Sequence, residues 1–165
     1  MKLITKLLPN AMALFMAVIF LDSLRYKFTN HPNTQEIFGR LDGWAESLGA
    51  GGLFAQTGLF SQYVIGGAEL IASALLLIGV LPRFHVLQTL GALIGLAVMT
   101  GAVSFHLFTP LGIDPNNDGA GLFVAACINL GFAIVLLTVF RRRELGALLG
   151  RLAAIFAPYN NTELS

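Results

Sequence analysis

Four ionisable residues could do chemistry because they lie within or beside long apolar stretches of the sequence. Glu69 is the single ionisable residue of the apolar run 63–81, and Lys27, His106 and Asp118 lie near the ends of other apolar runs. A carboxylate inside a bilayer is costly unless it faces other helices or water and finds a partner or a proton. We therefore expect Glu69 to meet Lys27 and His106, with Asp118 nearby, as a cluster that could bind a ligand or relay protons.

Four further polar residues could support this cluster. Asp22 and Arg25 are three positions apart, which predicts a local ion pair at the membrane interface. Ser104 lies close to His106 in the sequence, but no motif for a serine nucleophile surrounds it. Asn129 falls near the middle of an apolar run and is expected to form hydrogen bonds between helices.

The cluster has two interpretations that the sequence leaves open. Lys27 either reaches into the protein or extends along its flexible stem to the lipid headgroups. The cluster either acts on a ligand or forms a buried ion-pair network that fixes helix packing.

Composition identifies an integral membrane protein and excludes several classes of function. Of the 165 residues, 56% are hydrophobic and 12% are charged, against about a quarter charged in soluble domains, and the mean hydropathy is +0.76. A net charge of +1 gives no reason to expect nucleic acid as a partner. The single cysteine, Cys127, cannot form an internal disulfide or a redox pair. We expect no metal site and no encoded prosthetic group, and haem is disfavoured because His106 is the one histidine expected within the membrane.

Hydropathy predicts an all-α fold, a four-helix bundle in the membrane that forms one domain over residues 1–165. The expected spans are residues 7–25, 62–81, 86–108 and 120–140. Two amphipathic segments are expected on the membrane surfaces, at 34–48 on the outer side and 144–157 on the inner side. The first span resembles a secretory signal, but we expect it to be retained because no small-residue cleavage site follows its apolar core.

Basic residues predict the orientation of the chain. Lys2, Lys6, Arg83 and the triplet 141–143 flank the spans at ends that would share one side of the membrane. Positive residues favour the cytoplasmic side, so both termini are expected there and the ionisable cluster in the outer half.

Helical spacing predicts which faces point into the bundle. Gly66, Glu69 and Ser73 share one face of their helix. His106 follows a stripe of small residues that lets helices approach closely: Gly91, Gly95 and Ala102.

Residues near the ends of the expected helices predict how the helices are capped and which loop residues are solvated. Asn33 and Glu36 have the spacing of a capping box for the outer amphipathic helix, whose Trp44 is expected at headgroup level. His31 is expected to be a solvated loop residue, and Asp118 to cap the last span.

Short motifs over residues 10–140 together resemble the DoxX-like family of small bacterial membrane proteins. They are Tyr26-Lys27-Phe28-Thr29 followed by Pro32, Gly67-Ala68-Glu69-Leu70-Ile71-Ala72, Gly101-Ala102 leading to His106-Leu107, Leu111-Gly112-Ile113, and Asp118-Gly119. The resemblance implies a four-helix, multi-pass protein of the bacterial cytoplasmic (inner) membrane. The chain departs from the family pattern at Asn10, where many members carry arginine, and at Ala120, where a second glycine is usual.

Two functions of different classes follow from the cluster and the resemblance. The family takes its name from a subunit of a thiosulfate:quinone oxidoreductase, which implies a quinone-interacting, redox-linked subunit. Lys27 or His106 would then hydrogen-bond a quinone carbonyl, Glu69 and His106 would relay protons, and a partner would supply electrons. The alternative is a non-enzymatic accessory, binding or transport subunit. Expected partners are the lipid bilayer and either an oligomer of this chain or a larger membrane complex.

Overall fold

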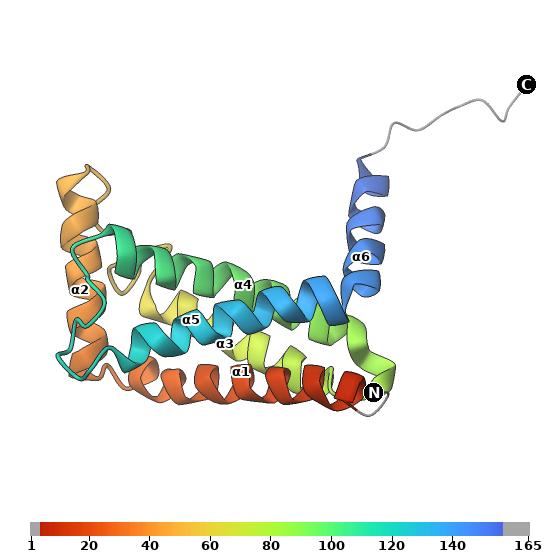
Figure 1. The fold of residues 1–165 in the computed structure, drawn as a ribbon. Helices are drawn as coiled ribbons and strands as arrows, with labels where there is room; N and C mark the ends of the chain where they lie inside the picture. The colour runs from red at the N-terminus through yellow and green to blue at the C-terminus, as the bar shows by residue number, and fades with distance from the viewer. Residues whose placement is uncertain (1–3, 157–165) are drawn as a thin grey trace, which may run out of the picture.

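The computed structural model describes residues 4–156, which form helices joined by turns and loops (Figure 1). The longer helices are α1 (Ile4–Phe28), α2 (Pro32–Ser47), α3 (Gln62–Ile78), α4 (His85–Phe108), α5 (Gly121–Val135) and α6 (Arg142–Ile155). A 3₁₀ turn, η1 (Pro82–Phe84), precedes α4, and a π-helical turn, η2 (Leu136–Phe140), extends α5. Lys2, the side chain of Lys6 and the last residue of the expected segment 144–157 lie outside the described residues, and the orientation stays a prediction.

Four helices lie alongside one another, and two lie across the ends of this group (Figure 1). Helix α1 packs against α3, α3 against α4, and α4 against α5, while α5 returns to contact α1. Helices α2 and α6 lie across opposite ends of the group and coincide closely with the two expected amphipathic segments (Figure 1).

Three helical stretches are long and apolar enough to cross a membrane: Leu7–Phe28, Pro82–Phe108 and Gly121–Phe140. These stretches match three of the expected spans and support a multi-pass membrane protein. Helix α3 is apolar but has only 17 residues and ends at Ile78, three residues before the expected end. It ends there because the chain turns through 79–81 into η1.

The turn between α3 and α4 is tight because it is built around a glycine. A Cβ atom at Gly79 would lie 2.3 Å from the backbone N of Gln88, closer than real atoms approach. Further along the pair, a Cβ at Gly91 would lie 2.9 Å from the backbone O of Ala72. Glycine at these positions therefore lets the two helices run side by side as antiparallel neighbours.

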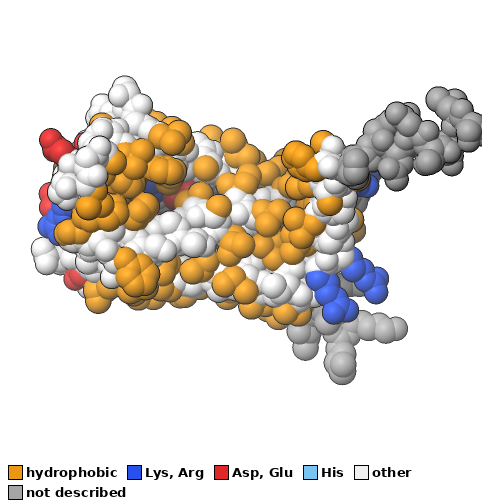
Figure 2. Space-filling model, turned by 90° about the horizontal axis from the view of Figure 1, so that it is seen from above, with side chains coloured by type: hydrophobic (Ala, Val, Ile, Leu, Met, Phe, Trp, Pro, Cys, Tyr) orange, Lys and Arg blue, Asp and Glu red, His pale blue; other side chains and the backbone are white. Residues whose placement is uncertain are grey.

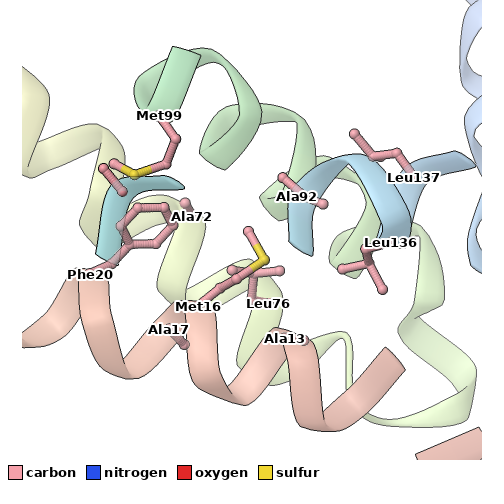
Figure 3. Close-up of a cluster of buried hydrophobic side chains, with 12 residues drawn as sticks. Ala13, Met16, Ala17, Phe20, Ala72, Leu76, Ala92, Met99, Leu136 and Leu137 are labelled. Atoms are coloured by element: carbon pink, nitrogen blue, oxygen red, sulfur yellow. The ribbon is translucent and has the colours of Figure 1, made fainter. Parts of the chain in front are cut away.

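The hydrophobic core joins all four helices in the half of the molecule next to this turn (Figure 3). Its large members Met16 and Phe20 come from α1 and are almost fully buried. Small residues surround them and let the helix backbones approach: Ala13 and Ala17 of α1, Ala72 of α3, Ala92 of α4 and Ala133 of α5. The small-residue stripe of α4 is used as expected, since Gly91, Gly95 and His106 are buried.

A polar network crosses the same end of the molecule. Arg141 is only 7% exposed, and its Nε donates to Oε1 of the fully buried Gln88 at 2.7 Å. Gln88 Nε2 in turn donates to Asn10 Oδ1 at 3.2 Å. The π turn places Arg141 in this network. Its backbone N–H donates to the backbone O of Leu136, five residues earlier, at 2.8 Å. Arg141 is therefore part of the packed interior, whereas Arg142 and Arg143 are exposed.

Both predicted helix caps are wrong. The capping box expected of Asn33 and Glu36 is not formed, because Asn33 lies inside α2 and Glu36 pairs with Arg40. His31, expected to be solvated, caps α2: its side chain accepts a hydrogen bond from the backbone N–H of Asn33 at 3.2 Å, and its ring packs edge-on against Tyr26. Asp118 makes no cap at α5, because Ala120 occupies the N-cap position in the left-handed conformation with φ +61°.

Replacing Ala120 with glycine is expected to stabilise the protein by up to about 1 kcal/mol, because glycine adopts positive φ without a Cβ clash. Thermal unfolding in detergent measures the change. As a control, Ala74→Gly on the exposed side of α3 should destabilise by about 1 kcal/mol, since alanine is the better helix former. A loss of stability in Ala120→Gly equal to that of the control would contradict the prediction.

Candidate functional site

Lys27 and Glu69 form a buried ion pair between α1 and α3. Lys27 Nζ lies 2.9 and 3.0 Å from the two carboxylate oxygens of Glu69 and also donates to the hydroxyl of Ser23. The side chains are only 13% and 3% exposed, respectively. Lys27 therefore points into the protein rather than towards the headgroups, and Glu69 has the partner that its position in an apolar run demands.

The expected inward face of α3 positions the carboxylate. Gly66, Glu69 and Ser73 are all buried, as their spacing predicts. A Cβ at Gly66 would lie only 3.4 Å from Cδ of Lys27, so a small residue there leaves room for the lysine stem. Ser73 donates its hydroxyl to the backbone O of Glu69 at 2.8 Å, so it satisfies its own hydrogen bond within the helix.

His106 is held in place by the loop that follows its helix. Its ring is 5% exposed and lies edge-on against Phe123 of α5, with 5.5 Å between ring centroids. Nδ1 lies 2.6 Å from the backbone O of Gly112, an acceptor, so the neutral ring carries its proton on Nδ1. The other nitrogen, Nε2, is left as an acceptor without a hydrogen-bond partner in the described part of the chain.

The ion pair and the histidine line one cavity of about 540 Å³. Its walls come from α1 to α5 and are mainly apolar, which makes the three groups its principal buried polar features. Figure 2 shows basic and acidic side chains recessed among hydrophobic ones in a hollow near the end of the molecule that carries α2. The expected direct contact between Glu69 and His106 is not formed; the two side chains share the cavity without a hydrogen bond.

Asp118 lies at a polar edge of the cavity with Asp22 and Asn116. It is exposed and makes no ion pair with the described residues. Its backbone N–H donates to Asp114 Oδ1 at 2.9 Å, and this bond is the main reason that the pKa of the Asp114 carboxyl lies below its usual value. Asp118 therefore shares the cavity with the other three residues but lies where water reaches it.

Aromatic residues from distant segments cover the cavity next to α2. Phe54, in the loop before α3, packs edge-on against Phe105 of α4 with 5.2 Å between centroids. Trp44 contacts the same Phe105 ring at 6.4 Å, and Leu41 and Leu111 complete this cluster. Sequence analysis did not find this cover, although the helical repeat that includes Leu41 and Trp44 marks the side of α2 that packs inward.

The four supporting residues do not act together: Asp22 and Arg25 pair with each other, and Ser104 and Asn129 lie elsewhere. Arg25 Nε and Asp22 Oδ1 form the expected local pair at 3.0 Å, on the exposed side of α1. Ser104 is half-buried and does not line the cavity. Asn129 is fully buried, but the interhelical hydrogen bond expected for it is absent, because neither side-chain atom finds a partner among the described residues.

The cavity combines a mainly apolar wall with one ion pair and one imidazole. Within residues 4–156, no three His, Cys, Asp or Glu side chains come together as a metal ion would require. Comparisons with protein-family models, with curated proteins and with solved structures found no match to this chain.

Proposed function

We propose that this protein is a DoxX-like subunit of the bacterial inner membrane. It would bind a quinone in the cavity that helices α1 to α5 line. The observation that carries the proposal is the placement of a buried ion pair and an imidazole in a mainly apolar cavity of about 540 Å³. Pockets for organic ligands have this size and this pattern of a few convergent polar groups in an apolar wall.

The polar groups suit the two forms of a quinone. To bind a quinone carbonyl, Lys27 would redirect one of the three N–H groups that it donates to Ser23 and Glu69. The acceptor Nε2 of His106 suits a quinol hydroxyl. Reduction of a quinone to a quinol takes up two electrons and two protons. Electrons would come from a redox partner in a larger membrane complex, and protons would reach the cavity from the polar edge at Asp118 through His106 or Glu69.

The proposal also places all four packed helices, α1, α3, α4 and α5, across the membrane. Helix α3 rises about 26 Å, close to the hydrocarbon thickness of a thin bilayer. Helices α2 and α6 at opposite ends would then lie on the two membrane surfaces, and the positive-inside rule would place α6 and both termini in the cytoplasm (Figure 1). The cavity, on the α2 side, would be in the outer half of the membrane.

Quinone content of the purified protein tests the proposal. Wild-type protein extracted in mild detergent should contain bound quinone, and Glu69→Gln and His106→Ala should each lose most of it. Glu36→Gln is the matched control, because Glu36 pairs with Arg40 at 2.6 Å on the exposed surface of α2. Equal quinone per folded protein in the wild type and in both cavity variants would reject the proposal.

The second candidate is a non-enzymatic accessory, binding or transport subunit in which the ion pair fixes helix packing. The observation in its favour is that Lys27 bonds both carboxylate oxygens of Glu69 and so satisfies the pair without a ligand. A stable oligomer or larger complex that copurifies with this chain and contains no quinone would favour this function.

A further inference from the structure

The cavity is bordered by α3 and α4 on the α2 side of their tight contact. Next to their turn the two helices are in tight contact at Gly79 and Gly91. Towards α2, residues of both helices line the cavity instead: Ile65 and Glu69 of α3, and Ala97 and Gly101 of α4. The cavity therefore reaches the space between the two helices at this level.

This gap reaches the lateral surface of the protein. Ala97 is both exposed and part of the cavity wall. A Cβ at Gly101 would meet only the Phe105 ring of its own helix within 4 Å, at 3.8 Å, so a larger side chain has space at this partly exposed position. Figure 2 shows the corresponding feature, a hollow edged by hydrophobic side chains on the side of the molecule. We call Ile65, Ala97 and Gly101 the lateral opening.

The lateral opening lies at a depth where lipid is the surrounding solvent. Ala97 is in the middle of α4, a helix that is long and apolar enough to cross a membrane. The middle of such a helix lies in the hydrocarbon core, so a gap at this level meets acyl chains. By contrast, the edge formed by Asp22, Asn116 and Asp118 is polar.

From these features we propose that the cavity holds only the head of its ligand, and that a hydrophobic tail passes between α3 and α4 into the lipid. A cavity of about 540 Å³ has the size that holds a drug-sized molecule, so a chain of many isoprene units would have to extend beyond it. The inference rests on the proposed function for the identity of the head. The lateral opening gives a lipid-dissolved ligand a path to the bilayer, separate from the polar edge at Asp118 that water reaches.

A larger side chain in the lateral opening tests whether the hydrophobic tail of the ligand passes through it. Gly101→Leu adds a side chain to the opening without touching the ion pair, and Gly131→Leu is the matched control because a Cβ there has open space and Gly131 does not line the cavity. The probes are decylubiquinone and its tail-less parent, dimethoxymethylbenzoquinone, added to protein in nanodiscs. Quenching of Trp44, the only tryptophan of the chain, reports binding because its ring contacts Phe105 of the cavity wall.

Wild type and Gly131→Leu should bind both quinones. Gly101→Leu should weaken decylubiquinone binding by about tenfold or more relative to binding of the tail-less quinone. Equal weakening of both probes, or of neither, would overturn the inference. Wild-type protein that binds neither quinone would instead reject the proposed quinone function.

The position of the lateral opening can be tested without any quinone. A single tryptophan at position 97, made as Ala97→Trp in a Trp44→Phe background, should be quenched by phosphatidylcholine brominated on its acyl chains and resist aqueous iodide. Quenching by iodide but not by brominated lipid would show that the opening faces water and would overturn the inference. This result is independent of what the cavity binds.

Discussion

Glu69→Ala is expected to destabilise the protein by about 3–5 kcal/mol, because it leaves the ammonium of Lys27 buried without its counter-ion. Lys27 is 13% exposed and receives both of its carboxylate contacts from Glu69, at 2.9 and 3.0 Å. The remaining acceptor, Ser23, carries no charge. Unfolding in mixed detergent micelles measures the change in free energy.

A double variant without either charge separates the lost pair from the charge left behind. Lys27→Met combined with Glu69→Leu removes both charges and should recover most of the stability lost in Glu69→Ala. Glu36→Ala is the surface control, because its partner Arg40 is exposed, and it should cost less than about 1 kcal/mol. A Glu69→Ala variant no less stable than this control would mean that water or headgroups solvate Lys27 after all.

Gly79→Ala should destabilise by about 3 kcal/mol or more, because even one methyl group overpacks the turn between α3 and α4. The added carbon would lie 2.3 Å from the backbone N and 2.5 Å from the Cα of Gln88, neither of which can rotate away. The two helices would have to separate, which would also disturb the hydrogen bonds from Gln88 to Asn10 and Arg141. Thermal unfolding and the yield of monodisperse protein both report the effect.

Gly67→Ala is the matched control on the same helix. A Cβ at Gly67 meets nothing within 4 Å, so the methyl group adds no contact. Because alanine is the better helix former, this variant should be neutral or more stable by up to about 1 kcal/mol. Similar behaviour of the two alanine variants would show that α3 and α4 have room to separate.

Sequence reasoning predicted what depends on local periodicity and on charge in apolar surroundings. The positions of the helices follow from runs of apolar residues and from turn residues such as Pro82. The partnership of Lys27 and Glu69 follows because a carboxylate in an apolar helix needs a compensating group, and lysine at a neighbouring span edge can supply it.

Features that depend on long-range packing were not predictable. The contact of Trp44 and Phe54 with Phe105 joins three segments whose proximity no local pattern encodes. Arg141 looks like the first of three equivalent arginines in the sequence, yet it alone is buried, because a π turn changes the direction of its side chain. Asn129 was expected to find a partner across the helices, and the residues around it supply none.

The π turn at Leu136–Phe140 also fixes the rotation of the chain about the helix axis at the end of α5. One residue corresponds to about 100° around an α-helix, so the extra residue in this turn sets the direction in which α6 leaves the end of α5 (Figure 1). Deleting a residue such as Thr138, which is exposed, would restore ordinary winding and swing both Arg141 and the apolar side of α6 round the axis. The direction of the last helix thus depends on the number of residues in the π turn as well as on side-chain contacts.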